Sequence, residues 1–156
     1  MPTPWKWIAI GAGGLLLLAG AGAAAVYAIA YVNGQPIGQI KLVTIDGKPV
    51  AEAVANAFLV MREAAKSAGI NLIIDSGFRT MEEQQALYAA YQAGTGNLAA
   101  KPGYSNHQNG TAIDIRVNGS FTSPEYLWLK ANAADYGFVN TGATFSQPEP
   151  WHWELA

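Results

Sequence analysis

The chain contains no cysteine among its 156 residues, and this absence excludes disulfide bonds, thiolate zinc sites and a cysteine nucleophile. Charged residues are also scarce, at 13%, and the net charge is −2. No basic run or aromatic-basic stripe is present, so we expect no nucleic-acid partner. Histidine occurs only twice, as His107 and His152. Both lie near carboxylate residues in the sequence, which makes them the first candidates for chemistry.

A long segment without charge lies near the N-terminus, from Trp7 to Val32. It exceeds the ~20 apolar residues that cross a bilayer as a helix. Lys6 before it places the N-terminus in the cytoplasm by the positive-inside tendency. The alternative is a cleaved signal peptide, because Ala28–Ala30 has the small-x-small form of a cleavage site. The apolar run is longer than the ~7–15 residues of a usual signal core, and this favours a single transmembrane helix.

The rest of the chain has the size of one compact domain. We therefore expect three segments: a membrane anchor or signal segment over residues 1–32, a turn-rich linker over 33–38, and a folded domain over 39–156. The domain would lie on the extracytoplasmic side of the cell membrane, or be secreted if the N-terminal segment is cleaved.

Strand and helix patterns alternate through the domain. We expect strands at Gln39–Ile45, Ile70–Asp75, Thr111–Val117 and Trp151–Leu155. We expect helices from Pro49 to Ser67, from Met81 to Ala93 with a Thr80–Glu83 capping box, and from Pro124 to about Tyr136. The order lacks the regularity of a parallel sheet. The fold class is therefore α+β, a small, mostly antiparallel sheet flanked by helices.

A metal site is the chemistry that the two histidines favour. Catalytic zinc takes about three His or carboxylate ligands and leaves one position open. His107 and Asp114 are separated by a sharp turn at Gly110, and His152 would reach them from the C-terminal strand. Glu149, three residues before His152, is placed to act as a general base. A chance His-x6-Asp pattern and a Ser105–His107–Asp114 triad are the alternatives from these residues alone.

The loop after the second predicted strand, "DSGFRT" at 75–80, adds an arginine to this group. A guanidinium there can hold a carboxylate or stabilise an oxyanion. Taken alone, Arg79 is better explained as a surface arginine that caps a turn.

Three motifs together resemble a known family: "SGFRT…EEQ", "GYSNHQNGTAIDI" and "EPWHWE". They are similar to the VanY-type zinc D-alanyl-D-alanine carboxypeptidases of the LAS superfamily. Lysostaphin-like enzymes, D-Ala-D-Ala dipeptidases and phage L-alanyl-D-glutamate endolysins are further relatives. The family pattern, Ser-x-His-x6-Asp followed by Glu-x-x-His, is present in order between Ile70 and Glu154.

The resemblance implies a role for each matched residue. One Zn²⁺ per chain would be bound by His107, Asp114 and His152, with Glu149 as the catalytic base. Arg79 would stabilise the oxyanion and help to bind substrate. Gln84 and Ser105 would contact substrate.

The implied function is removal of the terminal D-Ala from peptidoglycan stem peptides. An endopeptidase that cuts cross-bridges or the L-Ala-D-Glu bond is an alternative within the same chemistry. A catalytically silent wall-binding module is an alternative of another class.

Overall fold

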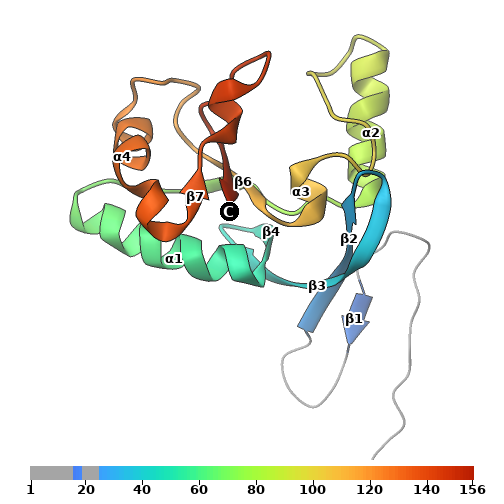
Figure 1. The fold of residues 1–156 in the computed structure, drawn as a ribbon, viewed down its shortest axis with the longest axis horizontal. Helices are drawn as coiled ribbons and strands as arrows, with labels where there is room; N and C mark the ends of the chain where they lie inside the picture. The colour runs from blue at the N-terminus through green and yellow to red at the C-terminus, as the bar shows by residue number, and fades with distance from the viewer. Residues whose placement is uncertain (1–15, 19–24) are drawn as a thin grey trace, which may run out of the picture.

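The computed structural model describes residues 16–18 and 25–156. Two four-stranded sheets organise the chain, and all the strand pairs described are antiparallel. The first sheet has the order β1-β2-β3-β4 and the second β5-β6-β8-β7 (Figure 1). The strands are β1 (Leu16–Leu18), β2 (Ala25–Val32), β3 (Gln35–Ile45), β4 (Lys48–Ala51), β5 (Ile74–Ser76), β6 (Ala112–Ile115), β7 (Phe138–Val139) and β8 (His152–Leu155). With the helices described below, the α+β, antiparallel fold class is confirmed.

Two tight turns build the first sheet. Asn33 and Gly34 connect β2 to β3, and Asp46 and Gly47 connect β3 to β4. All four residues have positive φ, between 50° and 78°. Positive φ at both central residues is the signature of the type I′ turn, whose twist matches that of antiparallel strands. The Asn-Gly and Asp-Gly pairs therefore determine where the chain folds back.

This sheet corrects the prediction for the N-terminal part of the domain. Ala25–Val32 forms β2 rather than the end of a transmembrane helix, and Gln35–Gly38 begins β3 rather than completing a linker. Over residues 16–18 and 25–156, we find no helix with the length and apolarity to cross a bilayer. Within the same predicted anchor, Leu16–Leu18 forms β1, and residues 1–15 and 19–24 lie outside the described residues.

Helix α1 (Glu52–Ser67) begins later than predicted, because Pro49 lies in β4 and pairs with Thr44. Its buried face is the one that the three- and four-residue spacing indicates, with Val54, Phe58, Met61 and Ala65 in the core.

The other helices follow their capping residues. Helix α2 (Met81–Gln92) has the predicted capping box between Thr80 and Glu83. Helix α4 (Pro124–Asn132) is capped by Ser123 and continues as the 3-10 turn η1 (Ala133–Tyr136). Two short elements were not predicted: α3 (Asn106–Asn109) and the 3-10 turn η2 (Thr141–Thr144).

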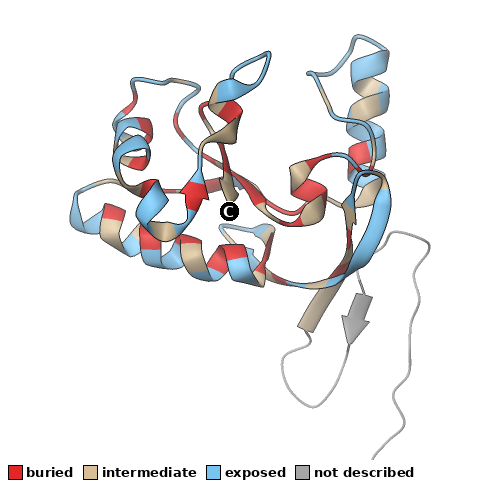
Figure 2. Ribbon diagram, in the orientation of Figure 1, coloured by how far each residue is buried: buried red, intermediate tan, exposed pale blue. Residues whose placement is uncertain are grey.

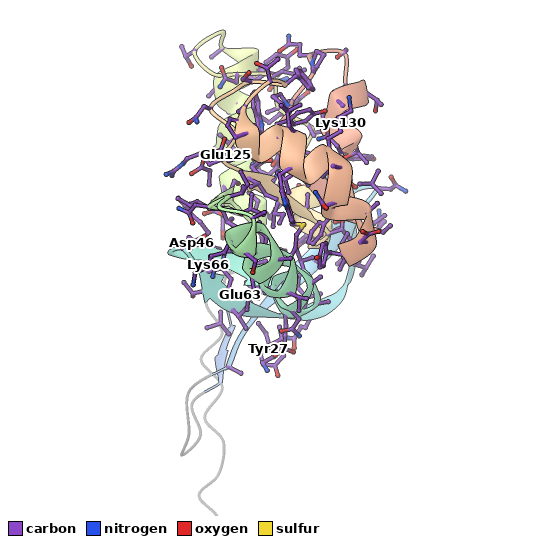
Figure 3. The ribbon with its side chains drawn as sticks, turned by 90° about the vertical axis from the view of Figure 1, so that its left-hand side faces the viewer. Tyr27, Asp46, Glu63, Lys66, Glu125 and Lys130 are labelled. Atoms are coloured by element: carbon purple, nitrogen blue, oxygen red, sulfur yellow. The ribbon has the colours of Figure 1, made fainter. Side chains whose placement is uncertain are left out.

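The main core lies where α1 faces the second sheet and α4. Figure 2 shows the buried residues gathered there, whereas α2 is mostly exposed. Figure 3 shows α1 and α4 on one outer face, with the exposed Glu63, Lys66 and Lys130 on it. A second, smaller cluster joins Ala28 of β2 and Leu42 of β3 to Phe78. This cluster ties the β2–β3 hairpin to the segment that precedes Arg79.

Candidate metal centre

Two neighbouring strands and one short helix bring His107, Asp114 and His152 together. Asp114 on β6 pairs directly with His152 on β8, so the two side chains emerge side by side on the sheet. His107 reaches them from α3. Asp114 Oδ1 lies 3.3 Å from His107 Nε2 and 3.1 Å from His152 Nδ1. One potential ligand atom from each residue lies within 4.8 Å of the others.

Local structure determines how His107 enters the site. Ser105 caps α3, accepting the backbone N–H of His107 at 3.3 Å, and Gly110 ends the helix with φ 84°. His107 Nδ1 donates to the carbonyl of Gly77 at 2.8 Å, which leaves Nε2 free to act as a ligand. The Ser105 hydroxyl contacts the backbone and the ring contacts Gly77 and Asp114. This geometry favours a metal site over a Ser–His–Asp triad.

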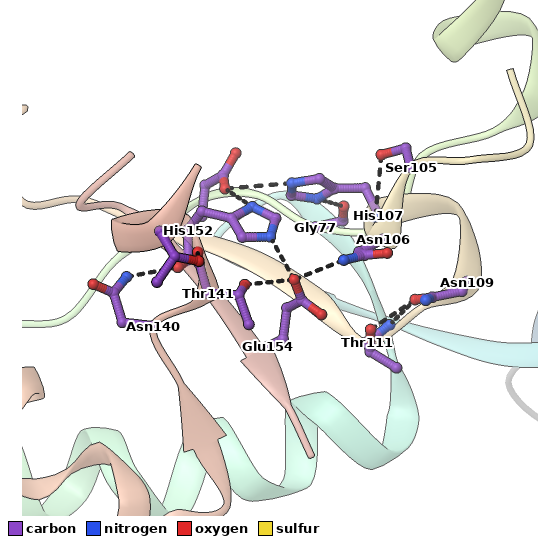
Figure 4. A network of polar contacts seen from close by, with 12 residues as sticks. Gly77, Ser105, Asn106, His107, Asn109, Thr111, Asn140, Thr141, His152 and Glu154 are labelled. Atoms are coloured by element: carbon purple, nitrogen blue, oxygen red, sulfur yellow. Dashed lines mark hydrogen bonds and ion pairs between the residues drawn. The ribbon is translucent and has the colours of Figure 1, made fainter. Parts of the chain in front are cut away.

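His152 is held from its other side by a carboxylate that the sequence reasoning did not assign. Its Nε2 lies 3.1 Å from Glu154 Oε1. The same oxygen accepts from Asn106 Nδ2 at 2.7 Å and from Thr141 Oγ1. Figure 4 shows these side chains converging on Glu154 from three elements. Because residues two apart on a strand share a face, the "HWE" sequence of β8 was a usable signal for this pair.

In this cluster, charges and hydrogen bonds shift the pKa values of Asp114 and His152 in the direction opposite to the effect of burial. Burial alone raises the pKa of Asp114, but hydrogen bonds and charge from His107 and His152 outweigh it and hold that pKa well below its usual range. Burial lowers the pKa of His152, yet Asp114 and Glu154 together raise it to about 9. The hydrogen bond from His152 is the main reason why the pKa of Glu154 falls to about 2.

The donor set fits Zn²⁺. Two imidazole nitrogens and one carboxylate oxygen make the three-ligand set of a catalytic zinc site with one open position. All three residues are largely buried, which limits competition from bulk water. Imidazole ligands suit zinc and other transition metals better than Mg²⁺ or Ca²⁺, which prefer oxygen.

Glu149 lies beside this cluster on the segment after η2. Its backbone N–H donates to the carbonyl of Gly142 at 2.8 Å, and its carbonyl accepts the N–H of His152 at 3.1 Å. A Cβ on Gly142 would lie 2.3 Å from the Glu149 carbonyl oxygen, so the close approach requires glycine. Burial raises the pKa of Glu149, with Asp114 adding to the effect, against the opposing charges of His152, His107 and Arg79. A raised pKa suits a carboxylate that must take up and release a proton near neutral pH.

Arg79 is held in place by Gln84. Arg79 Nη1 donates to Gln84 Oε1 at 2.9 Å, and Gln84 Nε2 donates to the carbonyl of Ala100 at 2.7 Å. Gln84 is fully buried and is not part of the cavity lining, whereas Arg79 is. Partial burial lowers the pKa of Arg79, and the nearby carboxylates of Asp114, Glu83 and Glu149 counteract this. In this geometry Gln84 orients Arg79, and direct contact with substrate stays a prediction.

A cavity of about 810 Å³ opens above the cluster. Its lining includes the candidate ligands, Glu149, Arg79 and Ser105. One wall comes from α2 and residues 96–100, with Leu87 and Leu98, and the opposite wall comes from residues 145–147. In Figure 1 the chain segments that supply these residues lie on either side of α3. The cavity is large enough for a short peptide, and the candidate ligands form part of its lining.

Comparison with known proteins identifies the family. The family model described as VanY, D-alanyl-D-alanine carboxypeptidase, matches residues 47–156. The chain belongs to the VanY family.

Individual relatives agree with this family. The D-alanyl-D-alanine carboxypeptidase of Enterococcus faecium is 35% identical over 114 residues, which are 66% of this chain and 36% of that protein. The peptidoglycan L-alanyl-D-glutamate endopeptidase CwlK of Bacillus subtilis (strain 168) is 36% identical over 74 residues, 46% of this chain and 42% of that one. The chain spans less than half the length of the curated relatives it matches.

A solved structure supports the fold as well. The crystal structure of the vancomycin-resistance D,D-pentapeptidase VanY from a VanB-type cassette, in complex with Zn(II), superposes with a TM-score of 0.62 at 26% identity. The match covers 81% of this chain and 86% of that one.

Residues outside the matched range 47–156 also contact the loop that leads to the site. The β2–β3 hairpin precedes residue 47, and its turn contacts the loop that leads to α3. Gly34 N–H donates to the carbonyl of Gly103 at 2.9 Å, and the Tyr104 ring lies against Gly34. Tyr104 also lines the cavity. The sequence did not predict this contact between the hairpin and the loop, because residues 33–38 were assigned to a linker.

Proposed function

We propose that this VanY-family domain is a zinc-dependent D-alanyl-D-alanine carboxypeptidase that removes the terminal D-Ala from peptidoglycan stem peptides. The observation that carries the proposal is the convergence of His107, Asp114 and His152 at a cavity that Glu149 and Arg79 also line. Family membership supports the substrate class, and the E. faecium relative and the Zn(II)-bound VanY structure support the reaction and the metal.

The residues of the chain have separate tasks in this reaction. When bound, Zn²⁺ supplies Lewis-acid chemistry, which polarises the scissile carbonyl and makes a water molecule more acidic. Glu149 takes a proton from the attacking water and returns it to the leaving amine, a role that its raised pKa suits. Arg79 brings a fixed positive charge to the cavity. It stabilises the developing oxyanion or binds the terminal carboxylate of the peptide.

The test is cleavage of a pentapeptide stem that ends in D-Ala-D-Ala, with products read by mass spectrometry. We expect loss of one alanine with zinc present and no loss after treatment with a chelator. Glu149→Gln protein loaded with zinc is the matched control, and it should leave the peptide intact. Intact peptide after incubation with zinc-loaded wild-type protein would contradict the proposal.

An endopeptidase is the second candidate, and the similarity to CwlK supports it. A second cavity of about 410 Å³ shares the lining residues Asp114 and Trp151 with the first, and a longer peptide would have to contact both cavities. Cross-linked muropeptides distinguish the two functions. Release of multi-residue fragments indicates an endopeptidase, and loss of single alanines a carboxypeptidase.

The same proposal places the domain outside the cytoplasmic membrane, where peptidoglycan lies. The uncharged run that starts at Trp7 supports export, by a retained anchor or a cleaved signal. Protease added to spheroplasts that produce the protein should digest the domain without lysis. Protection until lysis would contradict the extracytoplasmic location.

A further inference from the structure

The two histidines of the site contact their neighbours through opposite ring nitrogens. His107 has Nδ1 bonded to the Gly77 carbonyl and Nε2 facing Asp114. His152 has Nδ1 facing Asp114 and Nε2 facing Glu154. A metal ion bound by Asp114 and both rings would therefore contact Nε2 of His107 and Nδ1 of His152. The remaining nitrogen of each ring must carry a proton, and each has an acceptor in place.

The two acceptors differ in kind. Gly77 offers a backbone carbonyl. Its position is fixed because the following residue, Phe78, donates its N–H to the carbonyl of Pro49 at 2.7 Å. Glu154 offers a side chain, which needs other groups to hold it. Asn106 and Thr141 provide these groups, by donating to the same Oε1 atom that faces His152. Asn106 precedes His107 on α3, so this carboxylate links both histidines of the site.

We propose that Glu154 is a positioning residue that fixes the ring of His152 with Nδ1 toward the metal. The proposal rests on the zinc function proposed above and goes beyond it by assigning a role to a residue outside the ligand set. Partners of this kind set the tautomer and orientation of a ligating imidazole, and their loss typically weakens metal binding by ~10–100-fold.

Zinc affinity, measured by competition with a fluorescent chelator, is the first test. We expect Glu154→Ala to bind zinc about 10–100-fold more weakly than the wild type. Glu154→Gln should lose less, because its amide oxygen can still accept from His152. Thr141→Val removes one donor to Glu154 and should cause a smaller loss than Glu154→Ala. Glu63→Gln, an exposed change on the outer face of α1, is the matched control and should bind zinc as the wild type does.

A second measurement needs no variant and so cannot fail through misfolding. Nitrogen-15 NMR of the zinc-loaded wild-type protein should show His152 ligated through Nδ1 with a proton on Nε2, and His107 in the reverse arrangement. Ligation of His152 through Nε2 would overturn the proposal. So would zinc affinity of Glu154→Ala within about twofold of the wild type.

The tests separate this inference from the proposed function. At saturating zinc, Glu154→Ala should recover most of its kcat, whereas Glu149→Gln should stay inactive at any zinc concentration. Tight zinc binding with the expected tautomers but no peptide cleavage would leave the role of Glu154 standing and refute the carboxypeptidase function. Absence of zinc binding by the wild type would refute both.

Discussion

At the scale of single residues, charge and hydrogen bonding divide the site into ligands and reactive groups. The imidazoles and Asp114 contact one another closely, whereas Glu149 lies in the cavity with only backbone hydrogen bonds among those described. A carboxylate without a side-chain partner is available for proton transfer. This separation lets one substitution remove catalysis without removing the metal.

Glu149→Gln should test that separation directly. The amide keeps the size of the side chain but cannot take a proton, so we expect kcat to fall by about 10²–10⁴-fold. Zinc affinity should stay within about twofold of the wild type, because the ligands are other residues. Steady-state kinetics and metal competition measure both effects. An unchanged kcat would refute the role of Glu149 as the base.

The pKa of His152 predicts how the metal-free protein responds to pH. Its pKa is raised to about 9 from an ordinary value of 6.5, so the folded state binds this proton more tightly than the unfolded chain does. The stabilisation is complete below about pH 6.5 and is lost as pH rises through about 9. We therefore expect the free energy of unfolding of metal-free protein to fall over this interval, as measured by urea denaturation.

Two controls isolate this effect. Metal-free His152→Gln should not show this decrease in the free energy of unfolding, because glutamine does not titrate. Zinc-loaded protein should lack it too, because a metal-bound imidazole is already deprotonated. The same slope in metal-free His152→Gln and wild type would assign the pH dependence to another group.

At the scale of elements, the β2–β3 hairpin supports the loop that carries the site. The hairpin turn bonds to Gly103, and Ile40 on β3 packs against the end of α3, where a Cβ on Gly110 would lie 2.5 Å from Ile40 Cδ1. At Gly103 an added Cβ would meet the backbone of Gly34, whereas at Gly110 it would displace the end of the Ile40 side chain. The position of Tyr104 and of the segment containing His107 therefore depends on a hairpin distant in sequence.

Gly103→Ala should disturb this contact. A Cβ at Gly103 would lie 2.6 Å from the Cα of Gly34, so the hairpin and the loop must separate. We expect KM for the peptide to rise several-fold, because Tyr104 lines the cavity, together with a loss of stability. Steady-state kinetics and urea denaturation provide the readouts.

Gly47→Ala is the matched control for this change. Gly47 has a similar φ, 76° against 85°, but nothing lies within 4 Å of its added Cβ. Both variants carry the left-handed backbone cost of about 1 kcal/mol, so any difference between them reports the contact with the hairpin. Equal KM values for the two variants would show that the hairpin does not shape the cavity.

At the scale of the whole molecule, the folded domain begins before residue 39, the start predicted from the turn-rich segment 33–38. The expected start at residue 39 would remove β2 and the first part of β3. Phe78 and Leu42, which are 4% and 5% exposed, would lose the packing of Ala28. Because Phe78 directly precedes Arg79, the cost would fall on the site as well as on the core.

Two shortened proteins test this boundary. A protein that starts at residue 25 should unfold cooperatively and retain activity within a few-fold of the full chain. A protein that starts at residue 39 should lose roughly 3 kcal/mol or more, from the exposure of about two large apolar side chains. Urea denaturation of both zinc-loaded proteins measures the difference. Equal stability would show that β2 is dispensable.

The sequence by itself determined the local elements and the chemistry of the site. Capping residues and apolar spacing predicted α2, α4 and the buried face of α1, because these depend on neighbours within one or two turns. The residue types of His107, Asp114 and His152 indicated a metal, since both histidines of the chain lie near carboxylates and these are zinc-ligand types. The order of the motifs alone indicates the resemblance to the VanY enzymes.

Only the tertiary structure decided how these parts meet. The apolar run through Ala25–Val32 is compatible with a membrane helix and with a partly buried strand, and hydrogen bonds from the partner strand β3 decide between them. Which nitrogen of each histidine faces the metal depends on Gly77 and Glu154, and the carboxylate of Glu154 is itself placed by Asn106, far away in the sequence. The His152–Glu154 pair has a local signal in its two-residue spacing, but the other contacts form only when distant segments pack together.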